Sequence, residues 1–75
     1  MSNQEQMNAR AVVTEVIASS PHSFDDAIRV GLSRAQEQLE NISGAWVEDH
    51  RLDMRDGVIT AYQVTLKLSF DSDGG

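Results

Sequence analysis

The sequence predicts an α+β fold with the order β-α-β-β, in which one helix packs on one face of a three-stranded antiparallel sheet. Two patterns predict this fold class. Apolar residues recur at helical spacing between segments rich in β-branched residues, and the pair Asp56-Gly57 separates two alternating segments. The length of 75 residues allows one domain at most.

The first strand is expected at residues 11–18. This segment reads AVVTEVIA and is followed by Pro21, which ends a strand. A continuous apolar run is typical of a strand that is buried on both faces or lies at a subunit contact. Residues 1–9 and 71–75 are mostly polar or acidic, and we expect them to be disordered tails on a domain of residues 10–70.

The helix is expected to begin after Ser23 and to run to about Glu40. Ser23 can cap the free N–H groups of the first turn, and Asp25 and Asp26 would lie where the helix dipole favours negative charge. The small residue Gly31 would let the helix approach the sheet closely. The apolar stripe of the helix consists of Phe24, Ala27, Ile28, Gly31, Leu32, Ala35, Leu39 and Ile42.

The second and third strands are expected at residues 45–54 and 58–70, joined by the turn at Asp56-Gly57. Thirteen residues is long for a strand, so we expect the far end of the third strand to pair with a neighbouring subunit or to wrap onto it. One face of this strand is apolar and is expected to pack under the helix. That face carries Val58, Thr60, Tyr62, Val64, Leu66, Leu68 and Phe70.

The turn also predicts how the two strands are aligned. A two-residue turn at Asp56-Gly57 pairs Arg55 with Val58, and all other pairs follow from this one. The alignment places Trp46 and Gln63 on the same face of the sheet, away from the helix. The predicted pairs are Val47 with Leu66 on the helix side, and His50 with Gln63 and Trp46 with Lys67 on the other side.

The composition limits the functions that the chain can have. It contains 12 acidic and 6 basic residues and no cysteine. The net charge of −6 argues against binding to nucleic acid or to an anionic membrane surface. No nucleophile and base form a recognisable pair with an orienting third group, so we expect no enzyme. We expect a cytoplasmic protein that is stabilised by self-association, because so small a domain is only marginally stable alone.

Three stretches of the sequence resemble the dodecin family. They are SSPHSFDDAIRVGLSRAQEQLENI, the turn RDG and AYQVTLKLSF. The resemblance extends over about residues 12–70, and its most specific parts are Ser-Phe-Asp-Asp-Ala at the helix start and Tyr-Gln-Val-Thr-Leu-Lys in the last strand. It implies a hollow homododecamer that binds and stores a flavin (riboflavin, FMN or FAD) at its subunit interfaces without catalysis.

The resemblance also implies the residues of a flavin site. In flavin-binding members of the family, a tryptophan at the start of the second strand stacks on the isoalloxazine ring, and a glutamine of the third strand binds the pyrimidine edge. The glutamine corresponds to Gln63, whereas the tryptophan position corresponds to Gly44. Trp46, the only tryptophan of the chain, lies two residues later on the same strand face, about 7 Å away. The candidate flavin-binding residues are therefore Gln63, Trp46 and Gly44.

Each candidate residue also has a plainer interpretation. Trp46 is either a displaced stacking surface or an aromatic residue of the core or of a subunit contact. Gln63 recognises a ligand, satisfies a polar group at a subunit contact, or is a solvated surface residue. The alternative function is a flavin-free structural assembly that binds cations or another small ligand. No metal site is expected within one chain, because a solvated edge is the better interpretation of the acidic residues Glu48, Asp49, Asp53 and Asp56.

Overall fold

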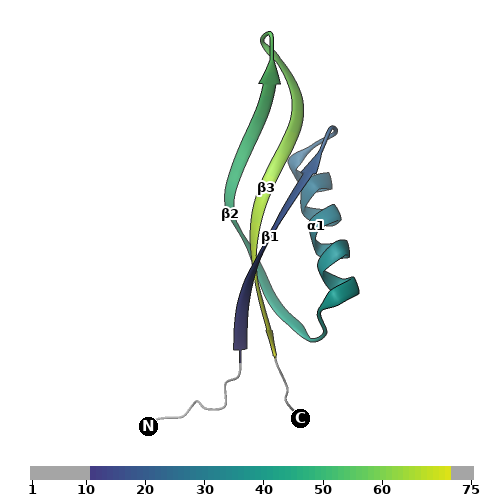
Figure 1. Cartoon of the computed structure of the whole chain (residues 1–75), viewed down its shortest axis with the longest axis vertical. Helices are drawn as coiled ribbons and strands as arrows, with labels where there is room; N and C mark the ends of the chain where they lie inside the picture. Colours follow the sequence, from purple (N-terminus) through teal and green to yellow (C-terminus); the bar gives the residue numbers. More distant parts are fainter. Residues whose placement is uncertain (1–10, 72–75) are drawn as a thin grey trace.

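The computed structural model describes residues 11–71 and contains four elements in the predicted order (Figure 1). They are β1 (Ala11–Ser20), α1 (Phe24–Gln38), β2 (Ile42–Arg55) and β3 (Val58–Asp71). Apart from Asp71, which ends β3, the tails expected from the sequence lie outside the described residues. Among the described residues, no helix has the length and apolar character needed to cross a membrane.

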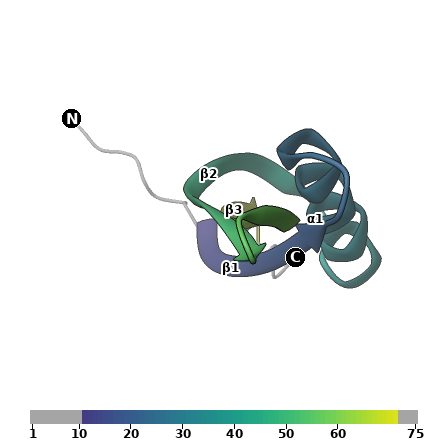
Figure 2. The same ribbon diagram turned by 90° about the horizontal axis from the view of Figure 1, so that it is seen from above.

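The sheet has β3 at its centre. Both neighbours run antiparallel to it, in the order β1-β3-β2. A view along the long axis of the molecule shows the sheet curling while α1 stays on one side of it (Figure 2). The predicted α+β class, with one helix on one face of a three-stranded antiparallel sheet, is therefore confirmed.

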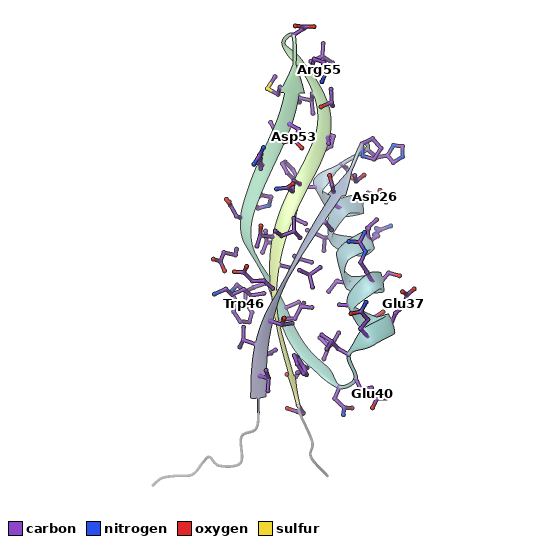
Figure 3. The ribbon with its side chains drawn as sticks, in the orientation of Figure 1. Asp26, Glu37, Glu40, Trp46, Asp53 and Arg55 are labelled. Atoms are coloured by element: carbon purple, nitrogen blue, oxygen red, sulfur yellow. The ribbon has the colours of Figure 1, made fainter. Side chains whose placement is uncertain are left out.

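Hydrogen bonds determine where α1 begins and ends. The backbone N–H of Asp26 donates to Ser23 Oγ at 2.9 Å, so Ser23 is the N-cap, as predicted. The Asp26 carboxylate accepts from Ser20 Oγ at 2.7 Å, which connects the end of β1 to the first helical turn (Figure 3). The helix ends two residues earlier than predicted. Asn41 then adopts a φ of 61°, and its carbonyl accepts a hydrogen bond from the Asp71 N–H at 3.1 Å.

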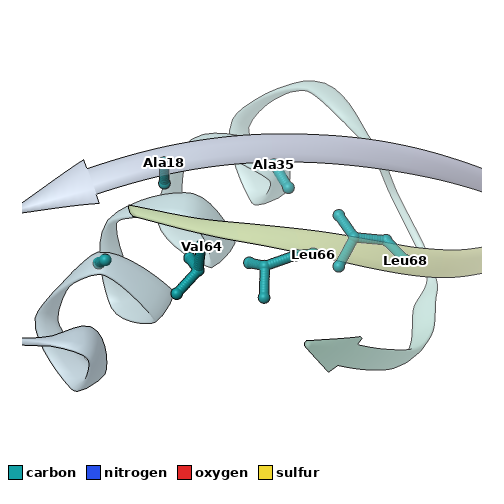
Figure 4. Close-up of a cluster of buried hydrophobic side chains, with 6 residues drawn as sticks. Ala18, Ala35, Val64, Leu66 and Leu68 are labelled. Atoms are coloured by element: carbon teal, nitrogen blue, oxygen red, sulfur yellow. The ribbon is translucent and has the colours of Figure 1, made fainter. Parts of the chain in front are cut away.

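The core lies between α1 and the central strand (Figure 4). It combines small residues of the helix and β1 with larger residues of β3, namely Ala18, Ala27, Ala35, Val64, Leu66 and Leu68. The alternation of β3 thus places Val64, Leu66 and Leu68 under the helix, as predicted. The prediction is wrong for Val58 and Thr60, which are exposed on the hairpin. A Cβ added to Gly31 would lie 2.8 Å from Leu66 Cδ1 and 3.2 Å from Ala18 Cβ. The helix and sheet are therefore as close as the small helix residues predicted.

The hairpin turn has the geometry that its sequence favours. Asp56 and Gly57 have φ angles of 53° and 77°, and positive values at both central residues define a type I′ turn. Arg55 pairs with Val58, as predicted. The last pair between β1 and β3 joins Ser20 to Tyr62. From there to the turn, β2 and β3 continue past β1 as a two-stranded ribbon (Figure 1).

The predicted alignment of β2 with β3 is correct at both ends and wrong in the middle. Thr60 has no partner on β2, and Glu48 has no partner on β3, so two β-bulges shift the register and then restore it. A third register shift, at Ser43, lies before the predicted strand. Val47 pairs with Leu66 and Trp46 with Lys67, as predicted. The pairing of His50 with Gln63 is wrong, because a bulge adds one residue to one strand and reverses which residues of the partner share a face. In the structure Arg51 faces Gln63, and His50 faces Val64.

Contacts on both sides of the shifted segment agree with this register. The Thr60 hydroxyl donates to the backbone carbonyl of Asp53 at 3.1 Å across the first bulge. The His50 ring lies 4.8 Å from the ring of Phe24, at the start of α1, in an edge-to-face arrangement. His50 is therefore on the helix side of the sheet and cannot face Gln63 from there.

Much apolar surface remains uncovered in a single chain. Val13 and Ile17 of β1 are 52% and 56% exposed, so the strand is not buried on both faces within one chain. The alternative, a subunit contact along β1, stays a prediction. The ribbon beyond β1 exposes Leu52, Met54, Val58 and Ile59. A two-stranded ribbon is marginally stable in water by itself, which favours a contact that covers it.

Replacing Gly57 by valine is expected to destabilise the hairpin by about 1–2 kcal/mol, because an L-residue with a branched Cβ is strained at positive φ. The φ of Gly57 is 77°, and no heavy atom lies within 4 Å of an added Cβ, so the cost comes from the backbone alone. Urea unfolding followed by circular dichroism measures it. Gly57→Asn is the matched control, because asparagine tolerates this conformation. Equal urea midpoints of unfolding for Gly57→Val and Gly57→Asn would contradict the positive φ at Gly57.

Candidate functional site

The candidate site is the face of the sheet that α1 leaves uncovered, which we call the open face. Val64, Leu66 and Leu68 point toward the helix, so the residues between them on β3 point to the opposite side. Cross-strand pairing extends this face over β2 and β1. The open face includes all three residues that the sequence identified as candidates: Gly44, Trp46 and Gln63.

Three neighbouring rows of side chains cross the open face from β2 through β3 to β1. The first row is Trp46, Lys67 and Glu15; the second is Asp49, Thr65 and Ile17; the third is Arg51, Gln63 and Ser19. Trp46 is 48% exposed and lies on the side of the sheet away from α1 (Figure 3). Gln63 is half-buried. Trp46 and Gln63 therefore share one face, as the predicted alignment required.

The spacing along β3 separates the three candidates. Trp46 is opposite Lys67, four residues from Gln63, which corresponds to about 13 Å along the strand. Gly44 is opposite Ser69, in the row beyond Trp46, and about 20 Å from Gln63 along β3. Trp46 is thus the nearer of the two β2 positions to Gln63. Ile17, an exposed apolar residue, belongs to the row that lies between Trp46 and Gln63.

One neighbouring side chain limits the space at Gly44 on the open face. A Cβ added there would lie 3.1 Å from Ser69 Oγ, which also lies 3.1 Å from Ser43 Oγ. The backbone of Gly44 does not have a positive φ, so a side chain is compatible with its conformation. A Cβ at this position therefore requires only that the Ser69 hydroxyl rotate away.

Two ion pairs order the charged residues of the open face. Lys67 Nζ lies 3.3 Å from Glu48 Oε1, and Arg51 Nε lies 3.0 Å from Asp53 Oδ1. Glu48 is the unpaired residue of the second bulge, and its contact with Lys67 places its carboxylate on this face. Both pairs are partly or largely exposed, so each contributes well under 1 kcal/mol to folding.

Sequence reasoning missed Arg51 as a neighbour of Gln63. It assigned His50 to that place, and the bulge at Thr60 moves His50 to the helix side and Arg51 to the open face. The bulged residue is a threonine, Thr60, and neither of its neighbours is glycine or proline, the residue types that often mark a bulge. The sequence pattern therefore contains no signal that would have identified Arg51.

The arrangement suits the recognition of a flat, partly polar molecule. An exposed indole and the aliphatic side chain of Ile17 offer apolar surface, and the amide of Gln63 offers both a donor and an acceptor. No three His, Asp or Glu side chains within residues 11–71 come close enough together to hold a metal ion. The acidic residues that the sequence interpretation assigned to a solvated edge, Glu48, Asp49, Asp53 and Asp56, are exposed or partly exposed.

The comparisons with known proteins agree with the geometry. A family model described as Dodecin matches residues 11–73. A dodecin from Streptomyces davaonensis is 37% identical; the match covers 89% of this chain and 98% of that chain, with a TM-score of 0.82. A dodecin from Streptomyces coelicolor is 33% identical; the match covers 93% of this chain and all of that chain, with a TM-score of 0.85. None of the curated proteins compared with the chain matches it.

A more distant structure shows the fold alone. The tt0972 protein from Thermus thermophilus is 23% identical, and the match covers 87% of this chain and 96% of that chain with a TM-score of 0.79. The β-α-β-β arrangement is thus retained when fewer than one residue in four is the same.

Proposed function

The chain belongs to the dodecin family, and from this premise we propose that it binds and stores flavins at the subunit interfaces of a hollow homododecamer, without catalysis. One structural observation carries the proposal for this chain. Gln63, at the position of the family's flavin-binding glutamine, lies half-buried on the open face together with the only tryptophan of the chain.

The open face fits the chemistry of a flavin. The isoalloxazine ring is flat and largely apolar, and its pyrimidine edge carries both hydrogen-bond donors and acceptors. The amide of Gln63 can pair with both kinds of group, and the indole of Trp46 can stack on the ring. Ile17, between them on the neighbouring strand, adds apolar surface. Storage needs no reacting group, so these residues have only to bind the ring and to exclude water from it.

The uncovered apolar surface supports the proposed assembly. Val13, Ile17 and Trp46 on the open face are each about half exposed, as are the apolar residues of the ribbon beyond β1. β1 and β2 are both edge strands of the sheet, so each leaves backbone groups without a partner on its outer side. A closed symmetric assembly would cover these surfaces in every copy and would place a bound ligand between subunits.

Titration of riboflavin with the protein, followed by flavin fluorescence, tests the flavin function. We expect quenching with the wild type. Both Trp46→Ala and Gln63→Ala should weaken binding by roughly threefold to tenfold, because one stacking contact or one neutral hydrogen bond contributes about 0.5–1.5 kcal/mol. Gln36→Ala, an exposed glutamine on α1, is the matched control and should bind like the wild type.

Two results would count against this site. Equal binding by Trp46→Ala and the wild type would exclude Trp46 as a stacking surface. Flavin fluorescence that stays constant even at high micromolar wild-type protein would exclude the flavin function. The alternative, a flavin-free structural assembly that holds cations or another small ligand, would then be the better explanation. The presence of Gly44, in place of the family's stacking tryptophan, is the observation that favours this alternative.

Light scattering of the full chain tests the assembly. We expect a mass near twelve times 8.3 kDa, or about 100 kDa. Twelve copies with a net charge of −6 each carry about −72 charges, so self-repulsion should make the assembly dissociate more readily at low salt. A folded monomer in dilute buffer would contradict the assembly. A dissociation midpoint that is independent of ionic strength would contradict the electrostatic argument only.

A further inference from the structure

The part of the open face that holds Trp46 and Gln63 carries more negative than positive charge. The excess is visible in the three rows already described and in the residues that form ion pairs with them. Four of these side chains are acidic and two are basic: Glu15, Glu48, Asp49 and Asp53 against Lys67 and Arg51.

Both basic side chains already have a carboxylate partner. Lys67 lies 3.3 Å from Glu48, and Arg51 lies 3.0 Å from Asp53, so an anionic ligand must compete with a carboxylate for each of them. The next basic residue on this side of β2 is Arg55, which precedes the hairpin turn, about 13 Å from Arg51 along the strand. A phosphate at the open face therefore meets two cations that are already ion-paired, together with the further carboxylates of Glu15 and Asp49.

Resting on the proposed function, we infer that the site selects flavins without a phosphate group, such as riboflavin, over phosphorylated flavins such as FMN. The two ligands share the same ring, so Trp46 and Gln63 do not distinguish them. They differ by a phosphate that carries about −1.5 to −2 charges at neutral pH. Each copy in an assembly contributes the same acidic face, so the repulsion of the phosphate adds up over neighbouring subunits.

Parallel titrations of riboflavin and FMN at two salt concentrations test this selectivity. In about 20 mM NaCl we expect FMN to bind at least roughly tenfold more weakly than riboflavin, because charges are poorly screened there. In about 500 mM NaCl the difference should shrink to less than about threefold, since the Debye length falls to a few ångströms. Riboflavin binding should change little between the two conditions.

A pair of double variants with equal changes in net charge locates the effect. The double variant Glu15→Gln with Asp49→Asn removes two negative charges from the open face. It should reduce the difference in affinity between riboflavin and FMN at low salt. Glu37→Gln with Glu40→Gln removes two charges from the end of α1 and the residues after it (Figure 3) and should leave the difference unchanged. Equal narrowing by both variants would show that net charge, and not the open face, repels FMN, and would overturn the inference.

The remaining outcomes separate this inference from the proposed function. FMN that binds as tightly as riboflavin at low salt, or more tightly, would overturn the selectivity while the flavin function stands. If the Arg55→Gln variant then binds FMN more weakly than riboflavin, the phosphate of FMN is bound at the hairpin. Absence of binding by either flavin at both salt concentrations would refute the proposed function, and the selectivity with it.

Discussion

Replacing Leu66 by alanine is expected to lower the free energy of unfolding by about 2–5 kcal/mol. Leu66 is 1% exposed at the centre of the core, with its Cδ1 directly below Gly31. Because the helix contributes only alanine and glycine at this contact, its side chains are too small to fill the cavity that the substitution leaves. A loss of this size is a large share of the stability of a small domain.

Urea unfolding, followed by circular dichroism at constant ionic strength, measures this loss. Leu52→Ala is the matched control, because Leu52 is 43% exposed on the hairpin ribbon. We expect Leu52→Ala to cost much less in the fold of the chain and to weaken the assembly, as measured by light scattering. If Leu66→Ala unfolds at the same urea concentration as the wild type, the core is not where the structure places it.

Replacing Gly44 by tryptophan is expected to tighten riboflavin binding by at least about tenfold, because the change supplies a stacking contact and buries apolar surface. Gly44 corresponds to the position of the stacking tryptophan in flavin-binding dodecins and offers no ring of its own. The backbone conformation accepts a side chain, and the nearest obstacle is Ser69 Oγ, 3.1 Å from the added Cβ. This hydroxyl can rotate, so the fold should tolerate the change.

Fluorescence titration of riboflavin measures the effect, and Gly44→Ala serves as the control. Alanine adds the Cβ without a ring, so it should bind riboflavin like the wild type. The combination of Gly44→Trp with Trp46→Ala shows whether the two positions act separately. A folded Gly44→Trp protein with unchanged affinity would mean that the ring of a bound flavin does not reach this row of the open face.

Local patterns in the sequence were sufficient for most of the fold. Ser23 caps the helix, and the pair Asp56-Gly57 forms the turn, because each residue type favours its backbone conformation regardless of the rest of the chain. The alternation along β3 correctly assigned Leu66 to the helix side and Gln63 to the opposite side, because side chains of a strand alternate between its faces.

The alignment of β2 was decided only by the tertiary structure. Thr60 and Glu48 form bulges through pairing across the hairpin, and neither residue type distinguishes a bulged position from a regular one. The bulges bring Arg51, and not His50, opposite Gln63, and they allow His50 to pack against Phe24. They thereby set the charged surroundings of the candidate site.

The sequence by itself determined the fold class, the turn and the face on which Gln63 lies. The tertiary structure decided which side of β1 is covered, because the run AVVTEVIA is mostly apolar on both faces and only the position of α1 covers one of them. It also decided which side chains surround Gln63. The physical reason is the same in both cases: alternation and capping depend on neighbouring residues, whereas strand register and layer packing depend on contacts between residues far apart in the chain.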